Sequence, residues 1–440
     1  MKFRISTANA VRNRVVCSQN NFNNLRAHNT YLLRALALTH KTFPSWSLGT
    51  RDRGLERKSM QRFVFLLYVA LTMVAFSCGC RDRANDSTDV PTLRIGHVGH
   101  DHHLALYTAL DNADEYVELT GLSVKMVRDR ELYELYDGSR KVANLEIVQV
   151  GGGAKMPTSL AQGVIDVGLG GVAPVLAACD RGAPVRLIAP LHSKGDMLVV
   201  RPDLRINSWQ DFVAYVKESD APIRIGYKSP MAVAKIVLED AMTHEGITFS
   251  GDMTNGRSQV HLINLKGGGK LNTSLSEGLV DAYVGNNPFP AIAADMGIGR
   301  IACDLETLPP GRFRNHPCCC VAANTRSLAG KEEAVEDLLV LLLQATETIN
   351  EKSDVEVEIA CRWLGTNEDV ERASISTSGY SLEASDEWHE CMSVWFDAMN
   401  NLGTFEGKLQ GFQESEAAAI AYDLSYLEQA EERLDAARTQ

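Results

Sequence analysis

The sequence predicts a two-lobed α/β fold in which each lobe is a mostly parallel sheet with flanking helices. The main observation is an internal repeat, because residues 145–178 recur as residues 260–293 after a shift of 115 positions. Each copy reads as a β-branched run, a glycine loop, a short helix that ends at Gly163 or Gly278, and a second apolar run. Two copies are too few for a stacked repeat array, so we expect two lobes with a ligand cleft between them.

Apolar runs alternate with helical patterns along the rest of the chain, as is typical of α/β proteins. The expected strands are residues 93–98, 145–150, 166–169, 185–191, 197–201, 223–227, 260–265, 282–284, 300–303 and 318–323. The expected helices include residues 104–110, 232–241, 334–350, 355–364, 385–400 and 414–437. Another helix, through Val216, is expected to begin after Ser208, because Ser208 and Asp211 resemble a capping box.

The composition is that of a soluble globular protein, with 45% hydrophobic and 23% charged residues. The net charge is −12, and residues 1–59 contribute +9, so the remainder of the chain carries −21. Such an acidic body argues against nucleic acid or an anionic membrane surface as a partner. It does not exclude small anions, because local dipoles bind them.

Residues 60–80 have the size and pattern of a signal peptide, with an apolar run followed by small residues. They also resemble a lipoprotein signal, in which Cys78 is the expected lipidation site, with Cys80 as the alternative, and residues 81–91 form a flexible tether. Because this signal begins far inside the chain, residues 1–59 are expected to lie outside the true protein, with translation starting at Met60. The alternative is a basic cytoplasmic segment before an uncleaved anchor.

Several segments, in order along the chain, resemble the nitrate/sulfonate/taurine-type substrate-binding proteins of ABC importers. They are residues 93–110, the Gly-Val-Ile-Asp-Val-Gly stretch 163–168, and residues 182–185, 198–201 and 281–290. The resemblance covers roughly residues 92–350 and implies a periplasmic-binding-protein type II fold. It implies one lobe of residues 92–195 plus 320–440, a second lobe of residues 196–319, and a hinge at the two crossings.

The resemblance further implies a monomeric, non-enzymatic protein without a cofactor, located in the periplasm or on the outer face of the membrane. Such a protein captures a small anionic solute (nitrate, sulfonate, taurine or bicarbonate) and delivers it to an ABC permease. The alternative is thiamine-pyrimidine-precursor binding, or a synthase-type enzyme of the same fold.

The candidate ligand-binding residues lie in loops that follow expected strands and open helices, where open α/β sheets bind ligands. They are His100, His102, His103, Gly152, Gly153, Gly170, Gly171, Val172, His192, Lys228, Ser229, Asn286 and Asn287. Glycines let a ligand approach the backbone, and helix starts favour negative charge. Each glycine taken alone is equally consistent with an ordinary tight turn, and Lys228 with a solvated side chain.

The run Gly-His-Val-Gly-His-Asp-His-His at residues 96–103 suggests a metal site at first sight. The sequence shows no matching His or carboxylate cluster elsewhere, so we expect no metal. Ligand hydrogen bonding by one or two of these histidines is the favoured interpretation, and surface or helix-start histidines are the alternative.

The run Cys318-Cys319-Cys320 is expected to be buried and structural. Strand alternation would point Cys318 and Cys320 to one face and Cys319 to the other. A disulfide and an iron site like that of the related thiamine-pyrimidine synthases are the alternatives. Asp166 and Asp281, which match each other in the repeat, are expected to be structural because each opens a strand away from the cleft.

Overall fold

The computed structural model describes residues 90–351 and 354–439. The chain divides into two units, Met1–Ser87 and Thr88–Gln440, and every described residue belongs to the second. The predicted signal peptide, the lipidation site Cys78 and the basic N-terminal segment therefore lie outside the described residues.

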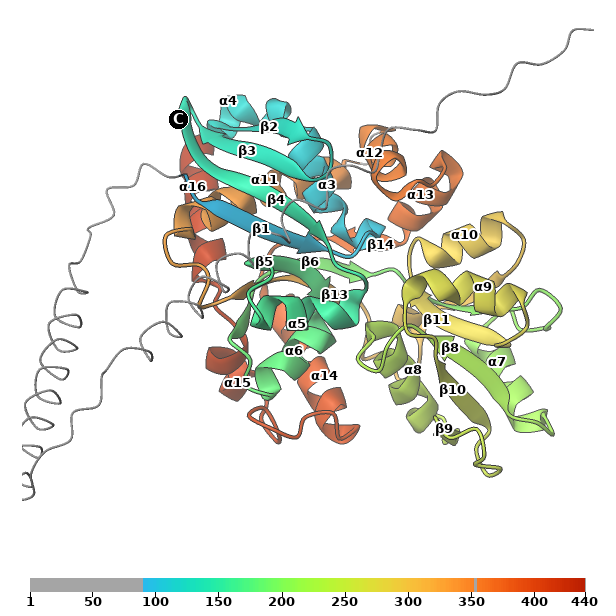
Figure 1. Ribbon diagram of the computed structural model, residues 1–440. Coiled ribbons are helices and arrows are strands. Elements are labelled where there is room, and N and C mark those ends of the chain that lie inside the picture. The colour runs from blue at the N-terminus through green and yellow to red at the C-terminus, as the bar shows by residue number, and fades with distance from the viewer. Residues whose placement is uncertain (1–89, 352–353, 440) are drawn as a thin grey trace, which may run out of the picture. The chain divides into compact units, whose positions relative to one another are not determined.

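The first sheet has eight strands in the order β14-β6-β13-β5-β1-β4-β3-β2 (Figure 1). Its strands are β1 (Thr92–His97), β2 (Leu122–Arg128), β3 (Leu132–Asp137), β4 (Arg140–Gln149), β5 (Val167–Gly171), β6 (Val185–Lys194), β13 (Pro317–Asn324) and β14 (Ser378–Tyr380). Strand β1 pairs in parallel with β4 and β5, whereas β13 runs antiparallel between β5 and β6. The first sheet is thus parallel at its centre and antiparallel towards both edges.

The second sheet has six strands in the order β12-β7-β11-β8-β10-β9, and it lies at the lower right of Figure 1 with α7 to α10 around it. Its strands are β7 (Asp196–Val200), β8 (Ile223–Tyr227), β9 (Phe249–Ser250), β10 (Val260–Asn264), β11 (Ala282–Asn286) and β12 (Arg300–Asp304). Its α-helices are α7 (Trp209–Glu218), α8 (Val233–His244), α9 (Leu271–Ser276) and α10 (Phe289–Asp295). Ser208 caps α7 as predicted, because its side chain accepts a hydrogen bond from the Asp211 N–H.

The internal repeat is present in the structure as two copies of one local unit. Helices α5 (Met156–Ala161) and α9 are related by the shift of 115 positions, and so are strands β5 and β11. The 3₁₀ turns η3 (Gly153–Lys155) and η4 (Gly268–Lys270) obey the same shift. Gly163 and Gly278 follow the two helices with φ of 67° and 68°, a conformation that favours glycine.

The remaining helices cover the first sheet or follow it in the chain. They are α3 (Leu104–Asp111), α4 (Val117–Thr120), α6 (Val172–Asp180), α11 (Glu332–Asn350), α12 (Asp354–Leu364), α13 (Glu368–Ser376), α14 (Asp386–Asn401), α15 (Glu414–Ala421) and α16 (Ser425–Arg438), with 3₁₀ turns η1 (Asp101–His103) and η2 (Ala113–Tyr116). The 3₁₀ turn η5 (Leu305–Thr307) instead packs on β7 and α8 of the second sheet. The single helix expected over residues 414–437 is wrong, because the chain breaks between α15 and α16. At the break Tyr422 forms a bridge to Leu187 of β6 and the Asp423 N–H donates to the Leu187 carbonyl.

Asp166 and Asp281 hold equivalent ion pairs, which agrees with a structural role for both. Asp166 accepts hydrogen bonds from the backbone and guanidinium of Arg94, and Asp281 accepts the same set from Arg224. Lys331 adds a second cation to Asp166 at 2.7 Å. The first pair joins β1 to the start of β5, and the second joins β8 to the start of β11.

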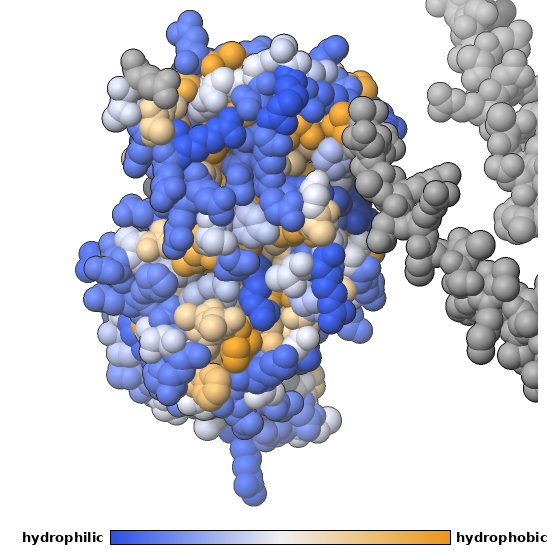
Figure 2. Space-filling view, turned by 90° about the vertical axis from the view of Figure 1, so that its left-hand side faces the viewer, coloured by the Kyte–Doolittle hydropathy of each residue, from blue (hydrophilic) through white to orange (hydrophobic). Residues whose placement is uncertain are grey.

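The described residues contain no helix long and apolar enough to cross a membrane. The face in Figure 2 is predominantly hydrophilic, with apolar side chains in small separate groups. Most large apolar side chains of the described residues are instead buried, and one extended core cluster contains side chains from both sheets and from the helices around them.

Candidate functional site

Loops that follow strands of both sheets line one cavity of about 590 Å³. The lining residues are Val98, Gly99, His100, Gln149, Val150, Gly151, Gly152, Gly153, Lys155, Lys228, Ser229, Pro230, Asn264, Lys266, Gly267, Gly268, Gly269, Asn286 and Phe289. The set contains three lysines, no arginine and no carboxylate. The cavity wall is therefore cationic although the protein body is acidic.

The two glycine loops of the repeat both belong to this cavity. Gly152 and Gly267 have φ of 113° and 146°, which L side chains rarely adopt, so glycine is required there for the loop to turn. Gly268 is required for space, because an added Cβ would lie 2.7 Å from the Phe289 ring. Only the first loop was predicted to belong to the site, although the repeat itself indicated the second.

Lys228 is held in place by a short chain of side-chain hydrogen bonds. Its ammonium donates to the Asn286 side-chain oxygen, and the Asn286 amide donates to the Asn287 carbonyl at 2.7 Å. Asn286 is fully buried, and the neighbouring Ser229 is nearly so. A cation positioned by a buried amide is pre-organised for an anionic ligand, because little side-chain entropy remains to be lost on binding.

Six of the predicted site residues line the cavity: His100, Gly152, Gly153, Lys228, Ser229 and Asn286. Seven do not: His102, His103, Gly170, Gly171, Val172, His192 and Asn287. Gly170 and Gly171 pair with β13, and a Cβ on Gly170 would lie 3.0 Å from Met156. The two glycines therefore take part in strand pairing, and Gly170 also allows α5 to pack closely on the sheet.

Asn287 connects the second sheet to the C-terminal helices. Its amide donates to the Ser374 carbonyl at 3.1 Å and to the Thr377 hydroxyl at 2.8 Å, both near the end of α13. Its backbone N–H donates to the Gly195 carbonyl at 2.9 Å, at the junction of β6 and β7. Asn287 is thus a contact between the two parts of the fold.

The lining residues that sequence reasoning missed are mainly those at the rims of the two loops. Gln149, Lys155, Lys266 and Phe289 lie close in sequence to predicted residues, but no local signal marked them. Lys155 and Lys270 occupy equivalent positions of the repeat, but only Lys155 lines the cavity. Equivalent positions in the sequence repeat therefore do not have equivalent surroundings in the structure.

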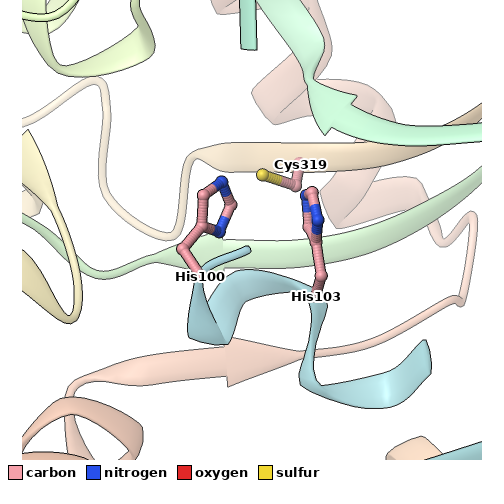
Figure 3. A group of neighbouring side chains, drawn as sticks. All are labelled: His100, His103 and Cys319. Atoms are coloured by element: carbon pink, nitrogen blue, oxygen red, sulfur yellow. The ribbon is translucent and has the colours of Figure 1, made fainter. Parts of the chain in front are cut away.

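A cluster of buried histidines and cysteines adjoins the cavity at His100. One group is His100, His103 and Cys319, and another is His102, His192 and Cys318, with the candidate ligand atoms of each group within 4.8 Å of one another. Figure 3 shows the Cys319 thiol pointing from its strand into the space between the rings of His100 and His103. The sequence shows no second His or carboxylate cluster, but the structure places two cysteines and the single His192 beside these histidines.

The expected alternation of the three cysteines is also wrong. The thiols of Cys318 and Cys319 both approach His102 Nδ1, at 3.4 Å and 3.9 Å. Strand β13 is irregular on both sides of Cys319 where it pairs with β6, so consecutive side chains turn towards the same side. Such a bulge depends on the pairing partner and cannot be predicted from the cysteine run alone.

Burial sets the charge states within the cluster. It lowers the pKa of His100, His102, His103 and His192 well below the usual range, and neighbouring positive charges add to the effect. These imidazoles are consequently neutral at pH 7. Burial also raises the pKa of the Cys318 thiol well above its usual value, so the side chain is a thiol unless a cation is bound.

The two sheets and the cavity between their loops define a periplasmic-binding-protein type II fold. The chain belongs to the NMT1-like family, which it matches over residues 126–364, more than half of its length. An uncharacterized protein of Methanocaldococcus jannaschii is 35% identical over 136 residues, which is 31% of this chain and 92% of that protein.

Solved structures of import proteins share this fold at low sequence identity. A zinc-bound ligand-binding component of an ABC-type import system from Staphylococcus aureus has a TM-score of 0.60 at 13% identity, over 77% of this chain and 99% of that one. The nitrate-binding protein NrtA from Synechocystis has a TM-score of 0.59 at 12% identity, over 78% and 89%. The alkanesulfonate-binding protein SsuA from Xanthomonas axonopodis has a TM-score of 0.53 at 15% identity, over 73% and 97%. The resemblance to nitrate- and sulfonate-type binding proteins is thereby confirmed.

Proposed function

We propose that this protein is a non-enzymatic solute-binding protein that captures a small organic anion outside the cytoplasm and delivers it to an ABC permease. The observation that carries the proposal is the charge of the cavity. Lys155, Lys228 and Lys266 line it without any carboxylate, in a chain whose body is strongly acidic. A local reversal of charge in a concave site selects for anionic ligands.

The arrangement can also meet the energetic cost of binding an anion. A desolvated anion needs several donors, because each charge-assisted hydrogen bond contributes only about 1.5–3 kcal/mol. Lys228, the buried hydroxyl of Ser229 and the amide of Asn286 lie together on one wall of the cavity. The two glycine loops that also line the cavity leave the backbone open to a ligand.

The size of the cavity favours an organic anion over nitrate or bicarbonate. Its volume of about 590 Å³ lies within the range of about 300–1,000 Å³ typical of small-molecule sites. Nitrate and bicarbonate have only four non-hydrogen atoms each and would leave most of this space to water. The family and the neighbouring structures, one of them an alkanesulfonate-binding protein bound to MOPS, support a sulfonate or similar ligand.

Titration calorimetry tests the proposal with alkanesulfonates, taurine, nitrate, bicarbonate and a neutral pyrimidine as ligands. Replacing Lys228 by Met should weaken binding of the preferred anion about tenfold or more, which corresponds to about 1.4 kcal/mol. Lys270→Met is the matched control, because Lys270 is exposed and lies outside the cavity. Tight binding of the pyrimidine alone, unchanged in Lys228→Met, would instead support the thiamine-precursor alternative.

We further propose that residues 92–195 plus 320–440 and residues 196–319 move as two lobes around the crossings. Lys194 and Gly195 at the first crossing both have positive φ, of 62° and 71°, so the backbone turns sharply between β6 and β7. Small-angle scattering should show a smaller radius of gyration when the preferred anion is bound. An unchanged radius at saturation would exclude closure.

Delivery to a permease requires export, and the signal-like residues 60–80 support it. We propose a mature protein that begins at Cys78, with that cysteine lipidated as a membrane anchor. Intact-mass measurement of the protein from the membrane fraction tests this. A mass that includes residues 1–59 would contradict it.

A further inference from the structure

We propose that the preferred solute carries two anionic groups joined by a short carbon chain, and that the cavity discriminates against zwitterions such as taurine. The inference rests on the proposed function and deepens it, because it names the class of anion that the same cavity takes. The observation that carries it is the number of cations. Lys155, Lys228 and Lys266 line the cavity without any carboxylate, so a ligand with one negative charge would leave two of the three cations without a counter-charge.

The three cavity lysines are not neutralised by ion pairs within the described part of the chain. There, the lysines that pair with a carboxylate are Lys141, Lys194, Lys235 and Lys331, and none of these lines the cavity. The other polar side chains of the lining are uncharged amides, a hydroxyl and the imidazole of His100. That imidazole is neutral because burial lowers its pKa well below the usual range. The counter-charge must therefore come from the ligand.

The three cations come from two different parts of the fold. Lys155 ends the 3₁₀ turn η3, which follows β4 of the first sheet, whereas Lys228 follows β8 and Lys266 follows β10 of the second sheet. Strands β8 and β10 pair in parallel, and the Gly267 N–H donates to the Lys228 carbonyl at 2.9 Å, so these two lysines belong to neighbouring loops. A ligand with two separate anionic groups can engage the cations of both sheets at once.

The first-sheet cation lies against a glycine loop. An added Cβ on Gly151 would lie 3.3 Å from the Lys155 ammonium, so this ammonium is folded back over the loop that lines the cavity. Glycines at this position let an anionic group approach the ammonium and the backbone together. This loop is therefore suited to the second anionic group, while Lys228 and its buried partner Asn286 are suited to the first.

Apolar side chains of the same cavity favour a carbon chain between the two anionic groups. They are Val98, Val150, Pro230 and Phe289. Removing apolar surface from water is favourable, and an inorganic dianion such as sulfate has no apolar surface to remove. A short methylene chain can cover these side chains while its two ends reach the cations.

The absence of a carboxylate from the cavity lining also explains why a zwitterion should bind poorly. An ammonium group on the ligand would lose water without gaining a counter-charge, which is costly in a concave site. It would also be repelled by the three lysines. The cavity should therefore select both for a second negative charge and against a positive one.

Titration calorimetry of the full-length protein at pH 7 tests the inference with three matched ligands. They are 3-sulfopropanoate, propane-1-sulfonate and 3-aminopropane-1-sulfonate, which differ chiefly in the charge at the end remote from the sulfonate. We expect 3-sulfopropanoate to bind at least tenfold more tightly than propane-1-sulfonate, about the gain from one charge-assisted hydrogen bond, and the amino compound to bind most weakly. Sulfoalkanoates and dicarboxylates with one to four methylene groups then identify the preferred spacing and end group.

Lys155→Met tests whether the first-sheet cation recognises the second charge. It should lower the ratio of the affinities for 3-sulfopropanoate and propane-1-sulfonate about tenfold, because the second anionic group loses its cation. Lys270→Met is the matched control, because Lys270 occupies the equivalent position of the repeat but is exposed and lies outside the cavity. This control should keep the wild-type ratio, and an unchanged ratio in Lys155→Met would overturn the role of Lys155.

The wild-type measurements alone can overturn the inference, so the result does not depend on how well the variants fold. Equal or tighter binding of propane-1-sulfonate than of every dianion tested would refute a dianionic ligand and leave the proposed function, capture of an anion, intact. Inorganic sulfate that binds as tightly as the best sulfoalkanoate would refute two separate groups. If none of the anions binds, the proposed function fails, and this inference fails with it.

Discussion

Replacing Asp166 by Ala should destabilise the protein more than the equivalent change in the second copy of the repeat, Asp281→Ala. The Asp166 side chain is fully buried, whereas that of Asp281 is 16% exposed. Both carboxylates face two cations, but the second one is closer to Asp166, which pairs with Arg94 at 2.8 Å and Lys331 at 2.7 Å. Asp281 pairs with Arg224 at 2.7 Å and with Arg201 only at 3.4 Å. Removal of the Asp166 carboxylate leaves Arg94 and Lys331 without their main partner and leaves the Arg94 N–H without its carboxylate acceptor.

The expected loss lies slightly below the usual cost of breaking a buried ion pair. That cost is about 3–5 kcal/mol when the remaining charge stays buried. The side chains of Arg94 and Lys331 are 33% and 17% exposed, so both can partly regain water. We therefore expect a loss of about 2–4 kcal/mol for Asp166→Ala, and about 1–2 kcal/mol for Asp281→Ala.

Urea unfolding at pH 7, followed by circular dichroism, measures both losses. Asp203→Ala is the control, because its carboxylate is 67% exposed and should contribute little. The effect should also depend on pH. Burial would raise the pKa of Asp166, but hydrogen bonds from Arg94 and Lys331 lower it below the usual value. The carboxylate's contribution is therefore present above about pH 4 and is lost as pH falls through the lowered pKa.

A loss below about 1 kcal/mol for Asp166→Ala at pH 7 would refute the reasoning, as would a larger loss for Asp281→Ala. A difference between wild type and Asp166→Ala that persists unchanged at pH 2 would show that the effect comes from packing and not from charge.

Three further predictions concern the cavity, the buried carboxyl group of Asp304 and the contact between the sheets. Gly268→Ala should weaken solute binding measured by calorimetry, because the new methyl group meets Phe289, whereas Gly269→Ala has open space and should not. Burial raises the pKa of Asp304 to about 6, so its ionisation costs stability as pH rises from about 4 to about 6. Asp304→Asn should flatten that decline and raise the thermal midpoint at pH 7, and an unchanged profile would exclude Asp304 as its source. Asn287→Ala removes two hydrogen bonds to the end of α13 and should increase the radius of gyration of the solute-free protein, so an unchanged radius would count against this contact.

Much of the fold was predictable because the strongest signals were local. Strands β5 and β11 are continuous apolar runs after a glycine-closed helix, and the same pattern occurs in both copies of the repeat. The hairpin of β2 and β3 was missed for the opposite reason. Charged residues interrupt both strands, and most of β2 is exposed, so no continuous apolar run marks the hairpin.

The cavity was predictable in part because loops after parallel strands gather at one end of a sheet. His100, Gly152 and Lys228 belong to such loops, and they line the cavity. Gly170 and Gly171 also lie at the end of a strand, but β13 pairs with them, so their backbone groups belong to the sheet and are not available to a ligand. That antiparallel strand returns from far along the chain, and no pattern near the two glycines indicates where it inserts.

The sequence by itself determined the repeat, the strand–loop–helix units built on it and the positions of the chemically active residues. Only the tertiary structure decided which of those residues meet. His102 and Cys318 are 216 positions apart and come within 3.4 Å because β13 enters the first sheet between β5 and β6. Local patterns record burial and turns, whereas the meeting of distant side chains depends on strand order and on a bulge, which arise from packing over the whole sheet.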